Sequence, residues 1–311
     1  MTNPDLSIQL APNNQKGLLL ANPIMAASGT FGYGTEYDGV IDIKKLGAVV
    51  SKGITLQPRQ GNSQPRLVET SSGMLNSIGL ENIGAEALIK EKAPLWNQWQ
   101  APVIVNIAGE SVVEYTEIAR MLDYIEGISA IEVNISCPNV ASGGAEFGID
   151  PEMAATVTSA VKQSTNLPTI VKLTPNVTEI VQIAKAVVGA GADSLTIANT
   201  FKGMAIDTAK RKPVLGNTVG GLSGPAIRPL ALYLVYRVAQ AVDVPIIGCG
   251  GISSTNDALE FLMAGASAVQ VGTATFVDPQ VMIQIVDGLE RFMQEHEVAN
   301  LSQLIGTAIL R

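Results

Sequence analysis

The chain contains few of the side chains that proteins most often use for acid–base and metal chemistry. Its 311 residues include one histidine, His296, and two cysteines, Cys137 and Cys249. A single histidine near one end argues against histidine as the acid or base of a reaction. It also leaves too few ligands for a zinc site, and two cysteines do not make a disulfide framework. We therefore expect a reduced, cytoplasmic protein without a bound metal, in which another side chain exchanges protons.

Charged side chains are also scarce, and acidic ones outnumber basic ones. Charged residues make up 15% of the chain, and the formal net charge is −8. This balance argues against nucleic acid as a partner, because phosphate backbones are bound by clustered Lys and Arg. No apolar stretch reaches transmembrane length, and the first residues resemble no signal peptide, so we expect no membrane association. Hydrophobic residues make up 47%, which is enough for a large core.

Short apolar runs of strand length recur along the whole chain. They lie at residues 23–28, 48–53, 103–108, 130–136, 169–173, 194–199, 245–250 and 268–272. Most are continuous rather than alternating, which is typical of parallel strands buried on both faces. Helical patterns lie between several of them, at residues 114–124, 151–164, 177–190, 229–241 and 254–264. The sequence thus alternates β and α segments about eight times.

This alternation predicts one α/β domain over residues 1–311, a (β/α)8 or TIM barrel. The segments 6–10 and 17–20 suggest a short N-terminal β-hairpin, and the longer connections suggest inserts at the C-terminal face of the strands. A doubly wound open sheet is the alternative. It is disfavoured because the first strand is not followed by a complete glycine fingerprint for a dinucleotide.

Polar residues gather at one end of the apolar runs. In chain order they are Ser28, Ser51, Lys52, Asn106, Asn134, Ser136, Cys137, Lys172, Thr174, Asn199, Thr200, Gly250, Gly251, Gly272 and Thr273. Each follows or completes the C-terminal end of its run, and this is the face on which barrels carry their active sites. Polar groups with a purely structural role would scatter to both ends. We therefore expect an active site at this face.

Lysines and glycines at these ends indicate an anionic ligand. Lys52 and Lys172 each end an apolar run, where a lysine either extends to the rim or supplies a positive charge to a site. The glycines after the last two strands allow a close approach of backbone N–H groups, as in the phosphate sites of barrels. The segment 220–224, Gly-Gly-Leu-Ser-Gly, could complete such a cradle, although ordinary turns also use glycine.

The two cysteines differ in their surroundings. Cys249 lies within an apolar run and is expected to be a small core residue. Cys137 instead follows Asn134 and Ser136 and precedes Pro138, at the end of a strand, where it could act as a nucleophile or as an acid–base group. The insert at residues 76–82 has polar amides between small and apolar residues, which suits a small, planar, polar ligand.

Several of these segments resemble the dihydroorotate dehydrogenase family, and the likeness covers essentially the whole chain. The matching segments are NISCPN at 134–139, SGMLNSIGL at 72–80, VKLTPN at 171–176, GGLSGPA at 220–226 and GCGGI at 248–252. The resemblance implies an FMN-containing barrel that oxidises dihydroorotate to orotate in pyrimidine biosynthesis.

The resemblance also implies roles for individual residues. Cys137 would be the catalytic base that removes the C5 proton of dihydroorotate, and Lys172 would lie against the flavin ring. The substrate would be bound by Lys52, Asn76, Ser77, Ile78, Gly79, Leu80, Asn134, Asn199 and Thr200. A single FMN per chain would be bound by Ser28, Lys52, Gly53, Asn106, Asn134, Lys172, Ala198, Gly224, Gly250, Gly251, Gly272 and Thr273.

Within the family, cysteine as the base and the absence of an N-terminal extension resemble the class that does not use membrane quinones. The run 73–82 resembles its NAD-linked type, a homodimer that pairs with a second subunit carrying FAD and an iron–sulfur cluster of the 2Fe–2S type, as a heterotetramer. Both of these groups are expected only on that partner.

Four alternatives stay open at this point. One is the fumarate-reducing homodimeric type of the same family. Another is a different flavin barrel, such as a dihydrouridine synthase, and a third is a lyase that forms a Schiff base at Lys172. The last is a barrel without catalytic activity.

Overall fold

The computed structural model describes residues 4–136, 138–139 and 145–310, and this part of the chain is built around a closed barrel. Its eight strands are β3 (Ile24–Ala26), β4 (Ala48–Val50), β7 (Val103–Ile107), β8 (Ala130–Asn134), β11 (Thr169–Lys172), β12 (Ser194–Ile197), β17 (Ile246–Cys249) and β18 (Ala268–Val271). Each pairs in parallel with the next in this order, and β18 pairs with β3, which closes the ring. The predicted (β/α)8 barrel is confirmed.

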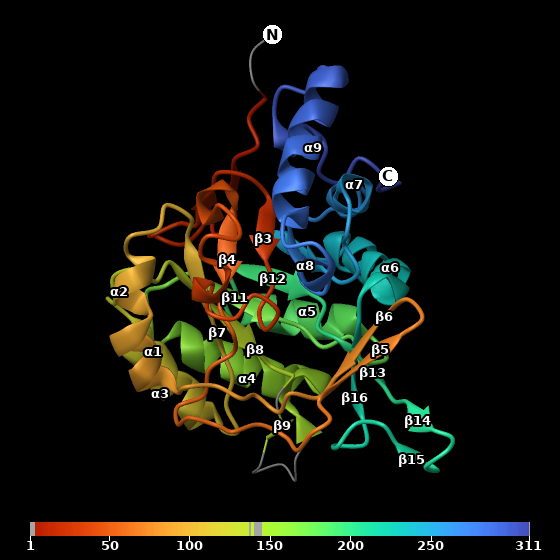
Figure 1. Cartoon of the computed structure of the whole chain (residues 1–311). Coiled ribbons are helices and arrows are strands. Elements are labelled where there is room, and N and C mark those ends of the chain that lie inside the picture. The colour runs from red at the N-terminus through yellow and green to blue at the C-terminus, as the bar shows by residue number, and fades with distance from the viewer. Residues whose placement is uncertain (1–3, 137, 140–144, 311) are drawn as a thin grey trace.

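Helices surround the barrel (Figure 1). They are α1 (Ala85–Glu91), α2 (Ala93–Trp96), α3 (Val112–Leu122), α4 (Pro151–Lys162), α5 (Ile180–Gly189), α6 (Arg228–Ala239), α7 (Thr255–Met263), α8 (Ala274–Val277) and α9 (Val281–Glu295). Between β3 and β4 the chain forms two 3₁₀ turns, Thr35–Tyr37 and Ile43–Lys45, in place of a helix. None of the helices in the described ranges is both long and apolar enough to cross a bilayer.

Local sequence explains where the helices begin. Asp150 caps α4 by accepting a hydrogen bond from the Met153 N–H at 2.8 Å, and Pro151 takes the first helical position, where no N–H is needed. Ser254 caps α7 in the same way, with the Asp257 N–H at 3.2 Å. The five helices that the sequence predicts are all present, each within about three residues of its expected ends.

The N-terminal end of the barrel is closed by apolar side chains. Strands β1 (Ile8–Gln9) and β2 (Leu19–Leu20) pair as the expected antiparallel hairpin. Around it, Leu10, Leu18 and Leu20 are buried in one cluster with residues near the starts of the barrel strands, such as Met25 and Ile104. The polar strand ends therefore face the opposite, C-terminal end of the barrel.

Inserts after the strands build over the C-terminal end. Strands β5 (Leu67–Thr70) and β6 (Gly73–Asn76) come from the insert after β4, and β13 (Phe201–Gly203) and β16 (Gly220–Ser223) come from the insert after β12. They form one antiparallel sheet in the order β13-β16-β6-β5, which lies beside the barrel in Figure 1. Two further strand pairs are β14 (Ile206–Asp207) with β15 (Lys212–Pro213), and β9 (Pro138–Asn139) with β10 (Ala145–Glu146).

Candidate active site

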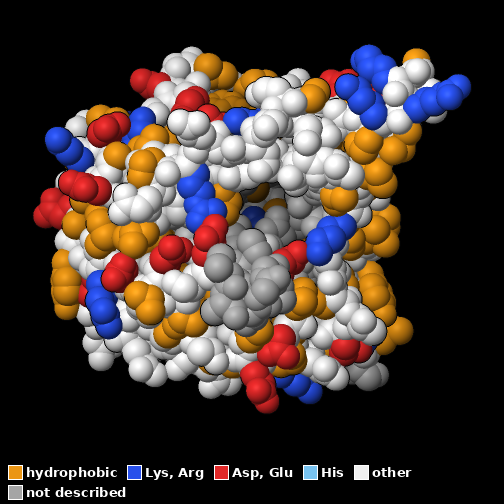
Figure 2. Space-filling view, turned by 90° about the horizontal axis from the view of Figure 1, so that it is seen from below, with side chains coloured by type: hydrophobic (Ala, Val, Ile, Leu, Met, Phe, Trp, Pro, Cys, Tyr) orange, Lys and Arg blue, Asp and Glu red, His pale blue; other side chains and the backbone are white. Residues whose placement is uncertain are grey.

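A cavity of about 820 Å³ lies between the C-terminal strand ends and the four-stranded sheet. Figure 2 shows the hollow in this face of the molecule. Many residues predicted to bind ligand contribute to its wall. These are Ser28, Asn76, Ile78, Lys172, Ala198, Asn199, Thr200, Gly224, Gly250, Gly251, Gly272 and Thr273. The structure thus brings together residues from most of the barrel strands and from both large inserts.

Other predicted residues do not contribute to the wall of this cavity. Lys52 and Gly53 follow β4, and the Lys52 ammonium is 3.9 Å from a carboxylate oxygen of Glu81. Ser77, Gly79 and Leu80 lie between β6 and α1, with Ser77 buried. The remaining two are Asn106, within β7, and Asn134, at the end of β8.

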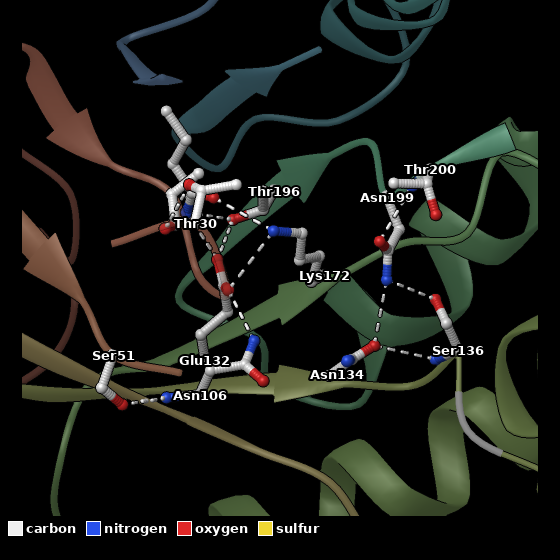
Figure 3. Close-up of polar contacts among 12 residues, drawn as sticks. Thr30, Ser51, Asn106, Glu132, Asn134, Ser136, Lys172, Thr196, Asn199 and Thr200 are labelled. Carbon is white, nitrogen blue, oxygen red and sulfur yellow. Dashed lines mark hydrogen bonds and ion pairs between the residues drawn. The ribbon is translucent and has the colours of Figure 1, made fainter. Parts of the chain in front are cut away.

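Asparagine side chains form a hydrogen-bonded group at the ends of β8 and β12. The Asn199 Nδ2 donates to Ser136 Oγ at 3.0 Å and to Asn134 Oδ1 at 3.3 Å, and its own Oδ1 accepts the Thr200 N–H at 2.8 Å (Figure 3). Tyr115 donates its hydroxyl to the Asn134 carbonyl at 2.6 Å. These contacts hold amide groups beside the cavity, where they can bind a polar planar ligand.

The structure describes only one of the two cysteines. Cys137, the predicted base, lies outside the described residues. Cys249 was expected in the core, but it is only partly buried and contributes to the cavity wall, because the strand that carries it ends there. Although part of the residue is exposed, the protein around the thiol shields it from water, and this raises the pKa of Cys249 against the opposing effect of the Lys172 ammonium. Cys249 is therefore a poor base near neutral pH, since the thiolate is the reactive form.

Lys172 meets a buried carboxylate at the floor of the cavity. Its ammonium is 3.7 Å from Glu132 Oε1 and donates to Gln270 Oε1 at 3.2 Å (Figure 3). Burial alone would lower the pKa of Lys172, but the combined effects of Glu132 and Cys249 outweigh burial, and the pKa is raised. The lysine is thus an ammonium ion at the floor of the site. This argues against a Schiff-base lyase, which needs a lysine with a depressed pKa.

Glycines line the cavity at the ends of β17 and β18. Gly250 and Gly251 have φ angles of 132° and 75°, which other residues rarely adopt. Gly272 has an unstrained backbone, and a Cβ there would lie 3.5 Å from Ala27 and 3.6 Å from Thr30, which both line the cavity. Backbone N–H groups can therefore approach an anion at this side of the cavity.

Hydroxyl groups add to the polar character of the same side. The Thr273 hydroxyl donates to Ser223 Oγ at 2.8 Å, which joins the end of β18 to β16. Ser253, after β17, donates both its N–H and its hydroxyl to Asp257 Oδ2, at 2.9 and 3.0 Å. The loops that would contact an anion are thereby tied to neighbouring elements.

Three residues of the site were missed by sequence reasoning. Glu132, Thr196 and Gln270 are buried inside the barrel and hydrogen-bonded to one another. A signal for them existed, because each is a polar residue inside an otherwise apolar strand, and a buried carboxylate needs partners. These residues lie one or two positions before the last residue of their strands, whereas the sequence prediction considered only the strand ends.

Comparison with known proteins agrees with this architecture. The family model described as dihydroorotate dehydrogenase matches residues 11–293. A "Dihydroorotate dehydrogenase B (NAD(+)), catalytic subunit" of Geotalea uraniireducens is 52% identical over 309 residues, covering 99% of this chain and all of the relative. Proteins with the same name are 56% identical in Desulforamulus reducens and 54% identical in Pelobacter propionicus. These two matches cover 94% and 97% of this chain and 96% and 98% of the relatives.

Proposed function

The chain belongs to the dihydroorotate dehydrogenase family, and on this premise we propose that it oxidises dihydroorotate to orotate in pyrimidine biosynthesis, with FMN in the cavity and NAD⁺ as the final acceptor. The observation that carries the proposal is the buried Lys172 ammonium at the floor of a cavity ringed by amides and glycines. Such a floor suits a flavin, because a cation near the ring favours the negative charge that reduction adds.

The residues present fit FMN in two independent respects. Gly250, Gly251 and Gly272 line the cavity at the strands after which barrels frequently bind phosphate, and Gly272 has no Cβ that would stand between its backbone and a phosphate. Asn106 Oδ1 is buried and has no hydrogen-bond partner among the described residues, so it can accept from a ring N–H. Ser28 and Gly224, which both line the cavity, would contact the same cofactor.

The proposed chemistry removes a proton and a hydride from neighbouring carbons. When bound, FMN supplies the acceptor for the hydride from C6 of dihydroorotate. Cys137, which follows β8 in the sequence, would take the proton from C5, which leaves the carbon–carbon double bond of orotate. Its role rests on the family resemblance, since the residue lies outside the described ranges.

The substrate would be held by amides and one lysine. Asn76, Asn134 and Asn199 offer donors and acceptors that match the ring amides, and Thr200 lies beside them. The Lys52 ammonium is 3.9 Å from Glu81, whose carboxylate also accepts from Arg66 at 2.8 Å. Because Glu81 is about half exposed, its contact with Lys52 is weak. Lys52 can therefore exchange this contact for the carboxylate of the substrate.

Electrons would leave through a partner protein. The relatives are named as catalytic subunits of NAD⁺-linked enzymes, which supports a second subunit. We assign to that subunit the FAD and the 2Fe–2S cluster, and to the whole assembly a heterotetramer around a homodimer of this chain, in the cytoplasm. Purification from the native host tests this arrangement. Co-elution of an iron–sulfur flavoprotein supports it, and a homodimer that reduces fumarate without any partner contradicts it.

Reconstitution tests the cofactor assignment. The purified chain is expected to be yellow, or to become so with FMN, at a single FMN per chain. A folded protein that stays colourless with FMN in excess would overturn the proposal.

A further inference from the structure

A carboxylate is enclosed beneath the cavity, and it is Glu132 on β8. Its side chain is fully buried, and it is not part of the cavity wall. Lys172, on the neighbouring strand β11, contacts Glu132 and also helps to line the cavity. Glu132 would therefore act on a ligand only through the residues that it contacts, among them Lys172 and Asn106.

The groups around Glu132 stabilise a negative charge on its carboxylate. Its Oε1 accepts from Asn106 Nδ2 at 2.7 Å, and its Oε2 accepts from Thr196 Oγ1 at 2.7 Å and Gln270 Nε2 at 2.6 Å (Figure 3). Three donors from three other strands thus converge on one carboxylate, in addition to the Lys172 ammonium at 3.7 Å. An ionised carboxylate accepts at both oxygens, and such a complete set of partners is what its burial requires.

Glu132 also influences whether Lys172 is protonated. The titratable groups that face Lys172 are Glu132 from β8 and Cys249 from β17. Burial alone would lower the pKa of Lys172, and the charge of Glu132, assisted by that of Cys249, raises it above the ordinary value. Without Glu132, burial becomes the dominant influence, so the pKa of Lys172 would fall.

From this geometry we infer that Glu132 is a positioning residue that holds the Lys172 ammonium in place and thereby sets the reduction potential of the bound cofactor. The inference rests on the proposed FMN site. It gives a function to the buried polar residues Glu132, Thr196 and Gln270, which take no part in the proposed chemistry. The net charge of the pair is zero while both groups are ionised, and it stays zero as long as Glu132 keeps the lysine protonated.

The variant Glu132→Gln tests the inference in the FMN-loaded protein. It keeps the size of the side chain and removes its charge. At low pH the lysine keeps its proton and gains an uncompensated positive charge. The cofactor should then be easier to reduce by a factor of roughly ten or more, and tenfold is about 30 mV for a two-electron couple.

The gain should disappear as the pH rises through the lowered pKa of Lys172, because the lysine then becomes neutral. The measurement is the midpoint potential by equilibration with redox dyes, from about pH 6 to about pH 10, a range that covers a depressed lysine pKa.

Two control variants separate charge from structure. In the double variant Glu132→Gln with Gln270→Glu, the carboxylate moves to the neighbouring position 270, where Gln270 Oε1 already lies 3.2 Å from Lys172 Nζ. This exchange should restore the potential and pH dependence of the original protein. Thr196→Val removes one hydrogen bond to Glu132 but no charge. It should lower stability and leave the curve of potential against pH unchanged.

The outcomes discriminate between the inference and the proposed function. If Glu132→Gln retains FMN and its potential follows the original protein at every pH, the inference is wrong. The inference is also wrong if the potentials of Glu132→Gln and of the original protein differ by the same amount at every pH, or if Thr196→Val shows the same difference. If Glu132→Gln does not retain FMN, the double variant Glu132→Gln with Gln270→Glu becomes the test of the inference. A double variant that binds FMN with the original curve supports the inference, and one that also loses FMN overturns it. Failure of the unmodified chain to bind FMN would instead overturn the proposed function.

Discussion

Substitution of Gly272 by alanine should affect the affinity for FMN without lowering the stability of the fold. A Cβ at this position meets Ala27 Cβ at 3.5 Å and Thr30 at 3.6 and 3.7 Å, which are ordinary contacts. The backbone of Gly272 is not in the left-handed region, so alanine adopts it without strain. The unfolding free energy of the protein without cofactor should therefore stay the same or rise by up to about 1 kcal/mol, because alanine restricts the unfolded chain.

The affinity for FMN should nevertheless fall. The new methyl group lies at the wall formed by Ala27 and Thr30, where the phosphate would approach the backbone. Loss of one hydrogen bond to a charged group costs about 1.5–3 kcal/mol. That cost corresponds to a rise in the Kd for FMN of about 10- to 150-fold.

The assay pairs two measurements on the same variants. The Kd follows from quenching of flavin fluorescence, and stability follows from urea unfolding of the protein without cofactor. Gly189→Ala is the matched control, because its Cβ meets nothing within 4 Å and it lies at the exposed end of α5. Gly250→Ala should lower both the affinity for FMN and the unfolding free energy. Its φ of 132° is unfavourable for alanine, and its Cβ would come within 2.9 Å of Ala231. An unchanged Kd for Gly272→Ala would show that the phosphate does not approach this strand end.

Two further substitutions test the proposed roles at the substrate side. Cys137→Ser should slow flavin reduction by dihydroorotate by at least about 100-fold near neutral pH while FMN stays bound, because a serine is a far poorer base; an unchanged stopped-flow rate would remove Cys137 from its role. Lys52→Ala should weaken orotate binding by about 10- to 100-fold in a flavin spectral titration, as expected for the loss of a charge-assisted hydrogen bond. Lys185→Ala, which removes an exposed lysine of α5, should bind orotate normally, and equal effects of the two lysine variants would contradict a specific contact.

The barrel could be predicted because its signals are local. Continuous apolar runs mark strands buried on both faces, and capping residues such as Asp150 mark helix starts. The face of the site followed from the same reasoning, since the ends of parallel strands meet at one end of a barrel. That is why residues as distant in sequence as Ser28 and Thr273 line the same cavity.

The sheet that covers the cavity could not be predicted in this way. Strands β6 and β16 pair across about 145 residues of sequence, with Asn76 opposite Gly221. Their short, glycine-containing segments carry no alternating pattern, so only the folded barrel brings them together. The core position expected for Cys249 was wrong for a related reason. An apolar run does not reveal which of its residues reaches the open end of the barrel.

The most direct test of the proposed activity is anaerobic mixing of the FMN-loaded protein with dihydroorotate. The flavin absorbance should bleach, and orotate should form in an amount equal to the flavin, with no partner subunit present. A protein that binds FMN in full but is not bleached by dihydroorotate would show that the chain does not oxidise this substrate.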